Sequence, residues 1–155
     1  MKKQPNSRMC FVCGFENPIG LKASFYENEA GQTICRFTPE EEHQGYPGVM
    51  HGGIISSLLD EVMGRATIAI AGWTATARIK VRFHHPVPLG RPMTLIGEVV
   101  RKWSRLIEAR GELHLEDGTL AAEAQGTYLR LPEDKFEEIN RHLEKEPSFW
   151  QVLPD

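Results

Sequence analysis

Long apolar runs are missing from this chain of 155 residues. No stretch approaches the roughly 20 apolar residues that a membrane-spanning helix needs. The N-terminal sequence Met-Lys-Lys-Gln-Pro-Asn-Ser-Arg is not followed by the roughly 7–15 apolar residues of a secretory signal peptide. Cysteine is also scarce, with three residues, which is typical of a reducing compartment. We therefore expect a cytoplasmic protein that does not contact membranes.

An excess of positive charge is absent as well. The net charge of −3 argues against a general nucleic-acid-binding protein. Residues 78–110, however, hold eight Lys or Arg side chains and two Glu side chains, so this segment carries +6 and the rest of the chain −9. Two interpretations stay open: a phosphorylated ligand that meets the basic segment, or a solvated strand face rich in arginine.

The length leaves room for one domain. Hydrophobic residues make up 41% of the chain and charged residues 25%, which is typical of a globular protein with a core of its own. We predict a single domain over residues 1–155. It includes an N-terminal Cys-x-x-Cys turn segment at 1–20 and a C-terminal helix and tail at 133–155.

Apolar periodicity predicts one long helix from Gly52 to about Ala71. From 74 to 131, apolar and polar residues alternate as in strands, interrupted by a loop at 85–90 and a hairpin turn at 116–118. Shorter strands are expected at 21–26 and 33–37, and an amphipathic helix at 133–146. Because hairpin connections give antiparallel pairing, we predict an α+β fold in which an antiparallel sheet wraps around one long central helix.

Two carboxylates stand in the middle of this apolar helix, where burial of an ionised group is costly unless the group is paired. Glu61 precedes Arg65 by four residues, the favourable spacing for an ion pair. Asp60 has no such partner nearby in the sequence, so we interpret it as a functional carboxylate. The alternative is a carboxylate wetted by solvent at the edge between helix and sheet.

The residues that open the helix, His51-Gly52-Gly53, are a second candidate. A helix start exposes unpaired backbone N–H groups and the positive end of the helix dipole. Glycines let a ligand approach that backbone closely. Such N–H groups suit a polarised carbonyl or a developing oxyanion.

Cys10 and Cys13 form a single Cys-x-x-Cys motif. Structural zinc sites usually have four ligands, so a site made from these two residues, Cys35 and a histidine stays open. A redox pair is less favoured because no helix start follows the motif. We favour a compact turn closed by residues 17–20 and predict no metal site, since His84 and His85 point to opposite faces of a strand.

The ordered motifs at 17–21, 43–53, 59–61 and 83–90 resemble those of the hotdog-fold acyl-CoA thioesterases, in the 4-hydroxybenzoyl-CoA thioesterase superfamily. The phenylacetate-pathway type is the most similar, and the resemblance spans about residues 10–131. It implies a hotdog fold and hydrolysis of an acyl-CoA to a free acid and coenzyme A. It also implies a homodimer or dimer of dimers that needs no cofactor, because coenzyme A is part of the substrate.

The resemblance also implies roles for individual residues. The Gly52 N–H, between His51 and Gly53, would polarise the thioester carbonyl. Asp60 would act as general base or nucleophile, and Thr76 would help to position water. Asp60 would face the His51-Gly52 segment of a second subunit, so that the active site lies between subunits.

Substrate contacts follow from the same resemblance. Some relatives carry Asn where this chain has Gly45, and Gln44 could take its place. Met63 is a candidate for the acyl pocket, together with Trp73 and Phe83. The basic residues that could meet coenzyme A phosphates are Arg82, Arg91, Arg101, Lys102 and Arg105.

Two other functions are compatible with this scaffold. A hotdog hydratase or dehydratase needs a cooperating His and acid, and His43 with Pro47-Gly48 faintly resembles its loop. A non-catalytic acyl-CoA-binding module would lack the helix carboxylate. The paired glycines and the position of Asp60 favour the thioesterase.

Overall fold

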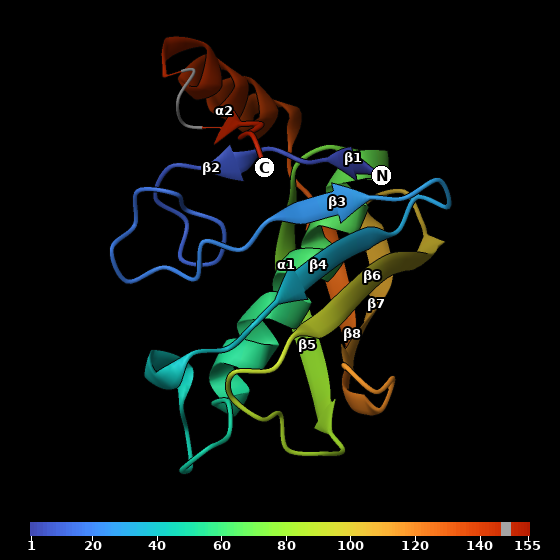
Figure 1. Cartoon of the computed structure of the whole chain (residues 1–155). Coiled ribbons are helices and arrows are strands. Elements are labelled where there is room, and N and C mark those ends of the chain that lie inside the picture. Colours follow the sequence, from blue (N-terminus) through green and yellow to red (C-terminus); the bar gives the residue numbers. More distant parts are fainter. Residues whose placement is uncertain (147–149) are drawn as a thin grey trace.

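The computed structural model describes residues 1–146 and 150–155. A seven-stranded sheet curves around the long helix α1 (Gly52–Ala71), which lies against its inner face (Figure 1). All strand pairs are antiparallel. This confirms the predicted α+β architecture. Residues 147–149 of the predicted C-terminal tail lie outside the described residues.

The strands of the large sheet include the four long ones expected between 74 and 131. In spatial order they are β1 (Lys2–Lys3), β3 (Phe25–Glu27), β4 (Thr33–Phe37), β6 (Met93–Lys102), β7 (Leu106–Leu115), β8 (Leu120–Arg130) and β5 (Thr74–Phe83). The strand expected at 21–26 is displaced to 25–27. Beside the sheet, β2 (Asn6–Ser7) pairs with β9 (Trp150–Gln151). The two-residue strands β1, β2 and β9 were not predicted.

The residues that flank helix α1 explain where it begins and ends. Its N-cap, His51, accepts a hydrogen bond from the Gly53 N–H through its side chain. It ends before Gly72, whose φ of 74° is a conformation that favours glycine. The other helices are η1 (Glu41–His43) and α2 (Glu133–Lys145), the latter within one residue of its predicted end. None of the helices in 1–146 or 150–155 combines the length and apolarity needed to cross a bilayer.

The core lies between α1 and the strands β6, β7 and β8. Two glycines in these strands let the helix come close. A Cβ atom on Gly97 would lie 2.3 Å from the Val62 carbonyl oxygen, and one on Gly111 would lie 3.2 Å from Met63 Cγ. Small residues at these strand positions therefore set how closely α1 can approach the sheet.

Strand β5 forms one edge of the large sheet. It pairs with β8, and in the described part of the chain its other side has no strand partner. The edge of a strand of 10 residues presents a row of unpaired backbone groups that favours pairing with another chain. Most side chains of β5 are exposed, including Phe83 at its end.

Candidate active site

The Asp60 carboxylate is held by two hydroxyl groups from the sheet. Its Oδ1 atom accepts hydrogen bonds from Thr76 Oγ1 at 2.9 Å and from the Tyr128 hydroxyl at 2.8 Å. Thr76 and Tyr128 face each other in the β5–β8 register, so the sheet pairing itself brings them together. The structure thus joins two predicted site residues, Asp60 and Thr76, in one cluster.

Tyr128 is a further candidate site residue, which the sequence did not indicate. Its side chain is almost fully buried, and its hydroxyl also lies 3.1 Å from the Asp60 carbonyl oxygen. Burial, and next the Asp60 carboxylate, raise the pKa of Tyr128. The tyrosine therefore remains a protonated donor that orients the carboxylate. The other oxygen, Oδ2, accepts no hydrogen bond from a described residue and, since Asp60 is half-buried, can be reached by water.

The helix start supplies the second predicted group. The His51 Nδ1 atom accepts from the Gly53 N–H at 2.8 Å, and the His51 carbonyl accepts from the Ile54 and Ile55 N–H groups. Among the described residues, the Gly52 N–H has no acceptor. Of the two glycines, Gly52 is therefore the one whose N–H is available to a ligand, while His51 and Gly53 shape the helix start around it.

The two groups are far apart within one chain. Gly52 and Asp60 are eight residues apart on α1, and an α-helix rises about 1.5 Å per residue, which separates them by about 12 Å. Reacting atoms must come within about 3–3.5 Å of each other. One copy of the chain therefore does not place the Gly52 N–H and Asp60 on the same carbonyl group.

The loop before α1 is held by its own hydrogen bonds. Gln44 Oε1 accepts from the Gly48 N–H at 2.9 Å, and the His51 N–H donates to the His43 carbonyl. A Cβ atom on Gly45 would lie 3.1 Å from His51 Cα, which gives a steric reason for glycine at this position. Gln44 and Gly45 thus support the helix start.

His43, the residue that suggested a hydratase, also has a local role. Its Nδ1 atom accepts the Glu40 N–H at 2.8 Å, and its ring packs against Phe37. These contacts close the short helix η1. The hydratase interpretation therefore has no support in the position of this imidazole.

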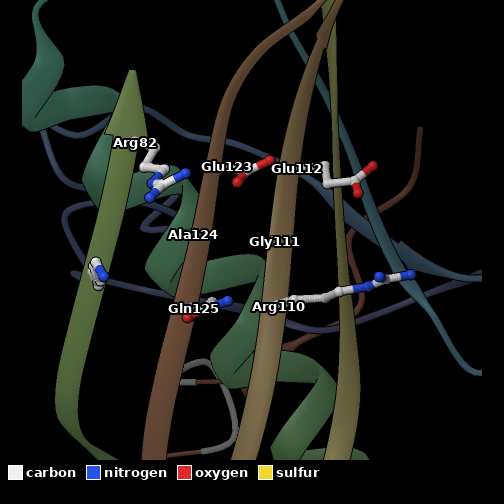
Figure 2. Close-up of a pocket in the computed structure, with 8 residues that line it drawn as sticks. Arg82, Arg110, Gly111, Glu112, Glu123, Ala124 and Gln125 are labelled. Carbon is white, nitrogen blue, oxygen red and sulfur yellow. The ribbon is translucent and has the colours of Figure 1, made fainter. Parts of the chain in front are cut away.

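The predicted phosphate-binding arginines lie elsewhere on the molecule. Arg82 lies on the outer face of the sheet, with α1 behind the strands, beside a depression of about 300 Å³ (Figure 2). The depression is lined by Lys80, Arg82, Arg110, Gly111, Glu112, Glu123, Ala124 and Gln125. Arg101 lies over the Trp103 ring, and Arg105 lies in the turn between β6 and β7.

In the described residues, no hydrogen bond or ion pair connects these arginines to Asp60 or to the helix start. The predicted pocket residue Met63 is fully buried in the core beside Gly111. The roles of Arg82, Arg101, Arg105 and Met63 in substrate binding stay predictions.

Comparison with curated proteins gives related sequences with known names. The chain is 29% identical to acyl-coenzyme A thioesterase THEM4 of Bos taurus over 127 residues, which cover 81% of this chain and 52% of that protein. It is 35% identical over 105 residues to the Saccharolobus solfataricus protein named "Putative esterase SSO2140", covering 66% of this chain and 74% of that protein. The chain spans about half the length of the THEM4 proteins that it matches.

Solved structures with the same fold include a thioesterase superfamily protein with a TM-score of 0.75 and 30% identity, covering 79% of this chain and 63% of that chain. The PaaI protein from the E. coli phenylacetic acid degradation operon gives a TM-score of 0.68 at 17% identity, over 72% of this chain and 81% of that one. A Streptococcus mutans protein bound to acetyl CoA gives 0.67 at 20% identity, over 76% and 90%.

These structural matches confirm the predicted hotdog fold. The family model described as "Thioesterase superfamily" matches residues 47–122, the segment that holds the helix start, Asp60 and Thr76. Together with the 35% identical relative, this match shows that the chain belongs to the thioesterase superfamily.

Proposed function

We propose that the chain hydrolyses an acyl-CoA thioester to a free acid and coenzyme A. The observation that carries the proposal is the Asp60 carboxylate, which two sheet hydroxyls orient while its Oδ2 atom stays open. The names of the THEM4 relatives and the acetyl CoA bound to a structural neighbour support the choice of substrate class.

The reaction needs a hydrogen-bond donor at the carbonyl oxygen of the thioester and a carboxylate near the carbonyl carbon. The Gly52 N–H donates to the thioester oxygen, where negative charge develops in the transition state. Asp60 either takes a proton from the attacking water or attacks the carbonyl carbon itself. In both cases a C–O bond forms, the C–S bond breaks, and the coenzyme A sulfur leaves as a thiolate that is then protonated. Where Asp60 is the nucleophile, the acyl group remains on its carboxylate as a mixed anhydride, and a water molecule then hydrolyses this anhydride to release the free acid and restore Asp60.

A second copy of the chain completes the site in this proposal. The distance of about 12 Å between Gly52 and Asp60 along α1 prevents them from acting together within one copy. Strand β5, whose outer edge has no strand partner among the described residues, carries Thr76 and ends at Phe83, whose ring lies against Gly52. A homodimer that pairs through this edge, alone or as a dimer of dimers, would place Asp60 opposite the partner's helix start.

The same proposal assigns the remaining contacts. Arg82, Arg101 and Arg105 would meet the coenzyme A phosphates from either copy as charge-assisted donors. Gln44 and Gly45 would shape the entrance next to the helix start.

A panel of acyl-CoAs, with released coenzyme A detected by a thiol reagent, tests the activity. Asp60→Ala should lower turnover at least about 100-fold, the scale of a positioned acid–base group. Asp60→Asn, which keeps the size and the hydrogen bonds from Tyr128, should lose as much. An unchanged rate would remove Asp60 from the mechanism. Hydration of an enoyl-CoA with no thiol released would establish the hydratase in place of the thioesterase.

A further inference from the structure

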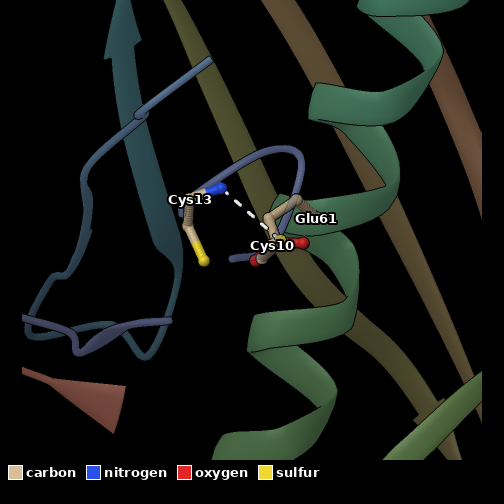
Figure 3. Close-up of side chains that lie close together, drawn as sticks. All are labelled: Cys10, Cys13 and Glu61. Atoms are coloured by element: carbon tan, nitrogen blue, oxygen red, sulfur yellow. Dashed lines mark hydrogen bonds between the residues drawn. The ribbon is translucent and has the colours of Figure 1, made fainter. Parts of the chain in front are cut away.

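The N-terminal Cys-x-x-Cys turn lies against the turn of α1 that carries Glu61 (Figure 3). The Sγ atoms of Cys10 and Cys13 and a carboxylate oxygen of Glu61 all lie within 4.8 Å of one another. The sequence suggested Cys35 and a histidine as the other ligands. Among the described residues, the structure brings Glu61 to the two cysteines instead, and Cys35 is buried on β4 outside this group.

The backbone of the turn presents both sulfur atoms on one side. The Gly14 N–H donates to the Cys10 carbonyl at 2.8 Å, and a Cβ atom on Gly14 would lie 2.2 Å from that oxygen, so glycine is required for the turn to close. The Val12 and Cys13 N–H groups donate to Cys10 Sγ at 3.3 and 3.5 Å. The Ser7 N–H donates to Cys13 Sγ at 3.4 Å.

These three N–H groups would donate to the sulfur ligands of a bound metal ion, as the outer contacts that orient such ligands do. In the metal-bound form, two thiolates and the Glu61 carboxylate would carry three negative charges, and Arg65, whose Nε lies 2.8 Å from Glu61 Oε1, would supply one positive charge. A divalent cation would bring the group to neutrality. Glu61 Oε2 accepts no hydrogen bond from a described residue and is left for such an ion.

We propose that Cys10, Cys13 and Glu61 bind a thiophilic divalent cation, Zn²⁺. Zinc binds thiolate at about 2.3 Å and carboxylate at about 2.0–2.2 Å in tetrahedral geometry, which places ligand atoms about 3.5–3.8 Å apart. Side-chain shifts of about 1 Å close the observed group to that size. Cys10 is only partly buried, so a water molecule can take the fourth position.

The proposed ion would tie the N-terminal segment to α1. Glu61 follows Asp60 directly, so the ion would fix the helix turn that carries the candidate base without touching the substrate. A redox dithiol is the competing interpretation. It is less favoured because no helix of the described residues begins at the motif, whereas the Glu61 carboxylate beside both sulfurs supplies a third metal ligand.

Metal content of untagged full-length protein, purified under reducing conditions without chelator, tests the proposal. We expect about one zinc per chain, and after removal and replacement by Co²⁺ a thiolate-to-cobalt charge-transfer absorption in the near ultraviolet. Cys10→Ser and Cys13→Ser should lose both signals, and Glu61→Gln should weaken zinc binding at least about tenfold. Cys35→Ala is the matched control and should keep one zinc.

Other outcomes would overturn the proposal. One is a protein with no zinc after exposure to Zn²⁺ and with all thiols free. Another is a protein whose mass, without reductant, is lower by two hydrogens because Cys10 and Cys13 form a disulfide. Loss of zinc in Cys35→Ala would move the site elsewhere. Asp60→Ala should bind zinc normally, so this test is independent of the thioesterase proposal.

Discussion

At the scale of single residues, Tyr128 should matter as a positioning residue. Its hydroxyl donates to Asp60 Oδ1, and a hydrogen bond to a charged group contributes about 1.5–3 kcal/mol. Tyr128→Phe should therefore lower kcat about 10–100-fold and leave KM nearly unchanged in steady-state kinetics with the best acyl-CoA.

Thr76 gives the matched comparison. Thr76→Val removes the other donor to Asp60 Oδ1 and should also lower kcat, whereas Thr76→Ser keeps the hydroxyl and should stay close to the parent. If Tyr128→Phe kept the parent kcat, the tyrosine would be a core residue without a role in orienting Asp60.

Substitution of Gly52 by proline tests the helix start because it removes the N–H group at that position. His51 has φ −64° and ψ 131°, a conformation that suits the residue before proline, and position 52 is the first of the helix, where proline is tolerated. Gly52→Pro should lower kcat about 10²–10³-fold, as expected for loss of an oxyanion donor. Gly52→Ala keeps the N–H, and its methyl group would lie 3.3 Å from the ring of Phe83, an exposed side chain that can shift. Gly52→Ala should therefore lose much less activity than Gly52→Pro; equal losses in both variants would contradict the assignment. Circular dichroism checks that the helix persists.

Asp60 and Tyr128 show what the sequence could and could not predict. Asp60 could be selected as a candidate because an acid without a local partner is unusual in an apolar helix. Tyr128 lies 68 residues away, and its meeting with Asp60 depends on the β5–β8 register and on which face the side chain takes. The remaining signal in the sequence was weak: Tyr128 is the one aromatic residue of β8, a strand with three alanines and one glycine.

At the scale of elements, the contact between α1 and β6 sets the spacing of helix and sheet. Gly97→Ala would place a methyl group 2.3 Å from the Val62 carbonyl oxygen and should destabilise the fold by about 1–3 kcal/mol in urea unfolding. Gly64 lies inside α1, where an added Cβ meets only Tyr128 Cε1 at 3.5 Å. Gly64→Ala should thus stabilise by about 0.5–1 kcal/mol. Equal effects of the two substitutions would contradict this packing.

The elements differ in how far local sequence determines them. The bounds of helix α1 that apolar periodicity predicted match the observed ones, which coincide with the His51 cap and with Gly72. Strands β2 and β9 have two residues each and exist only through pairing between positions such as Ser7 and Trp150. No local pattern encodes such a pair, because it forms only when the ends of the folded chain meet.

At the scale of the whole molecule, a mixed-subunit experiment tests whether the site lies between two copies. Asp60→Ala and Gly52→Pro should each be nearly inactive alone. In a mixed dimer, one site would combine the intact Asp60 of one copy with the intact Gly52 of the other. Co-expression with two different affinity tags, followed by tandem purification, should therefore recover up to about half of the parent activity per dimer.

The control is a mixed dimer of parent and Asp60→Ala chains, which keeps one intact site. Its activity per dimer is the value expected for full complementation. Sedimentation of the parent protein should show a dimer or a dimer of dimers. Mixed dimers that form without regaining activity would place both groups within one copy.

Asp60 and Glu61 are neighbours on helix α1, so an insertion in the helix before them would displace both residues together. Each inserted residue rotates the following helix positions by about 100°. An insertion between Gly52 and Asp60 would turn Asp60 away from Thr76 and Tyr128, and would turn Glu61 away from both cysteines in the same step. At Gly118, in a hairpin turn, an added Cβ atom would have no neighbour within 4 Å. Neither Asp60 nor Glu61 depends on the length of this turn. Length variation should therefore be tolerated in the hairpin turns and not in α1.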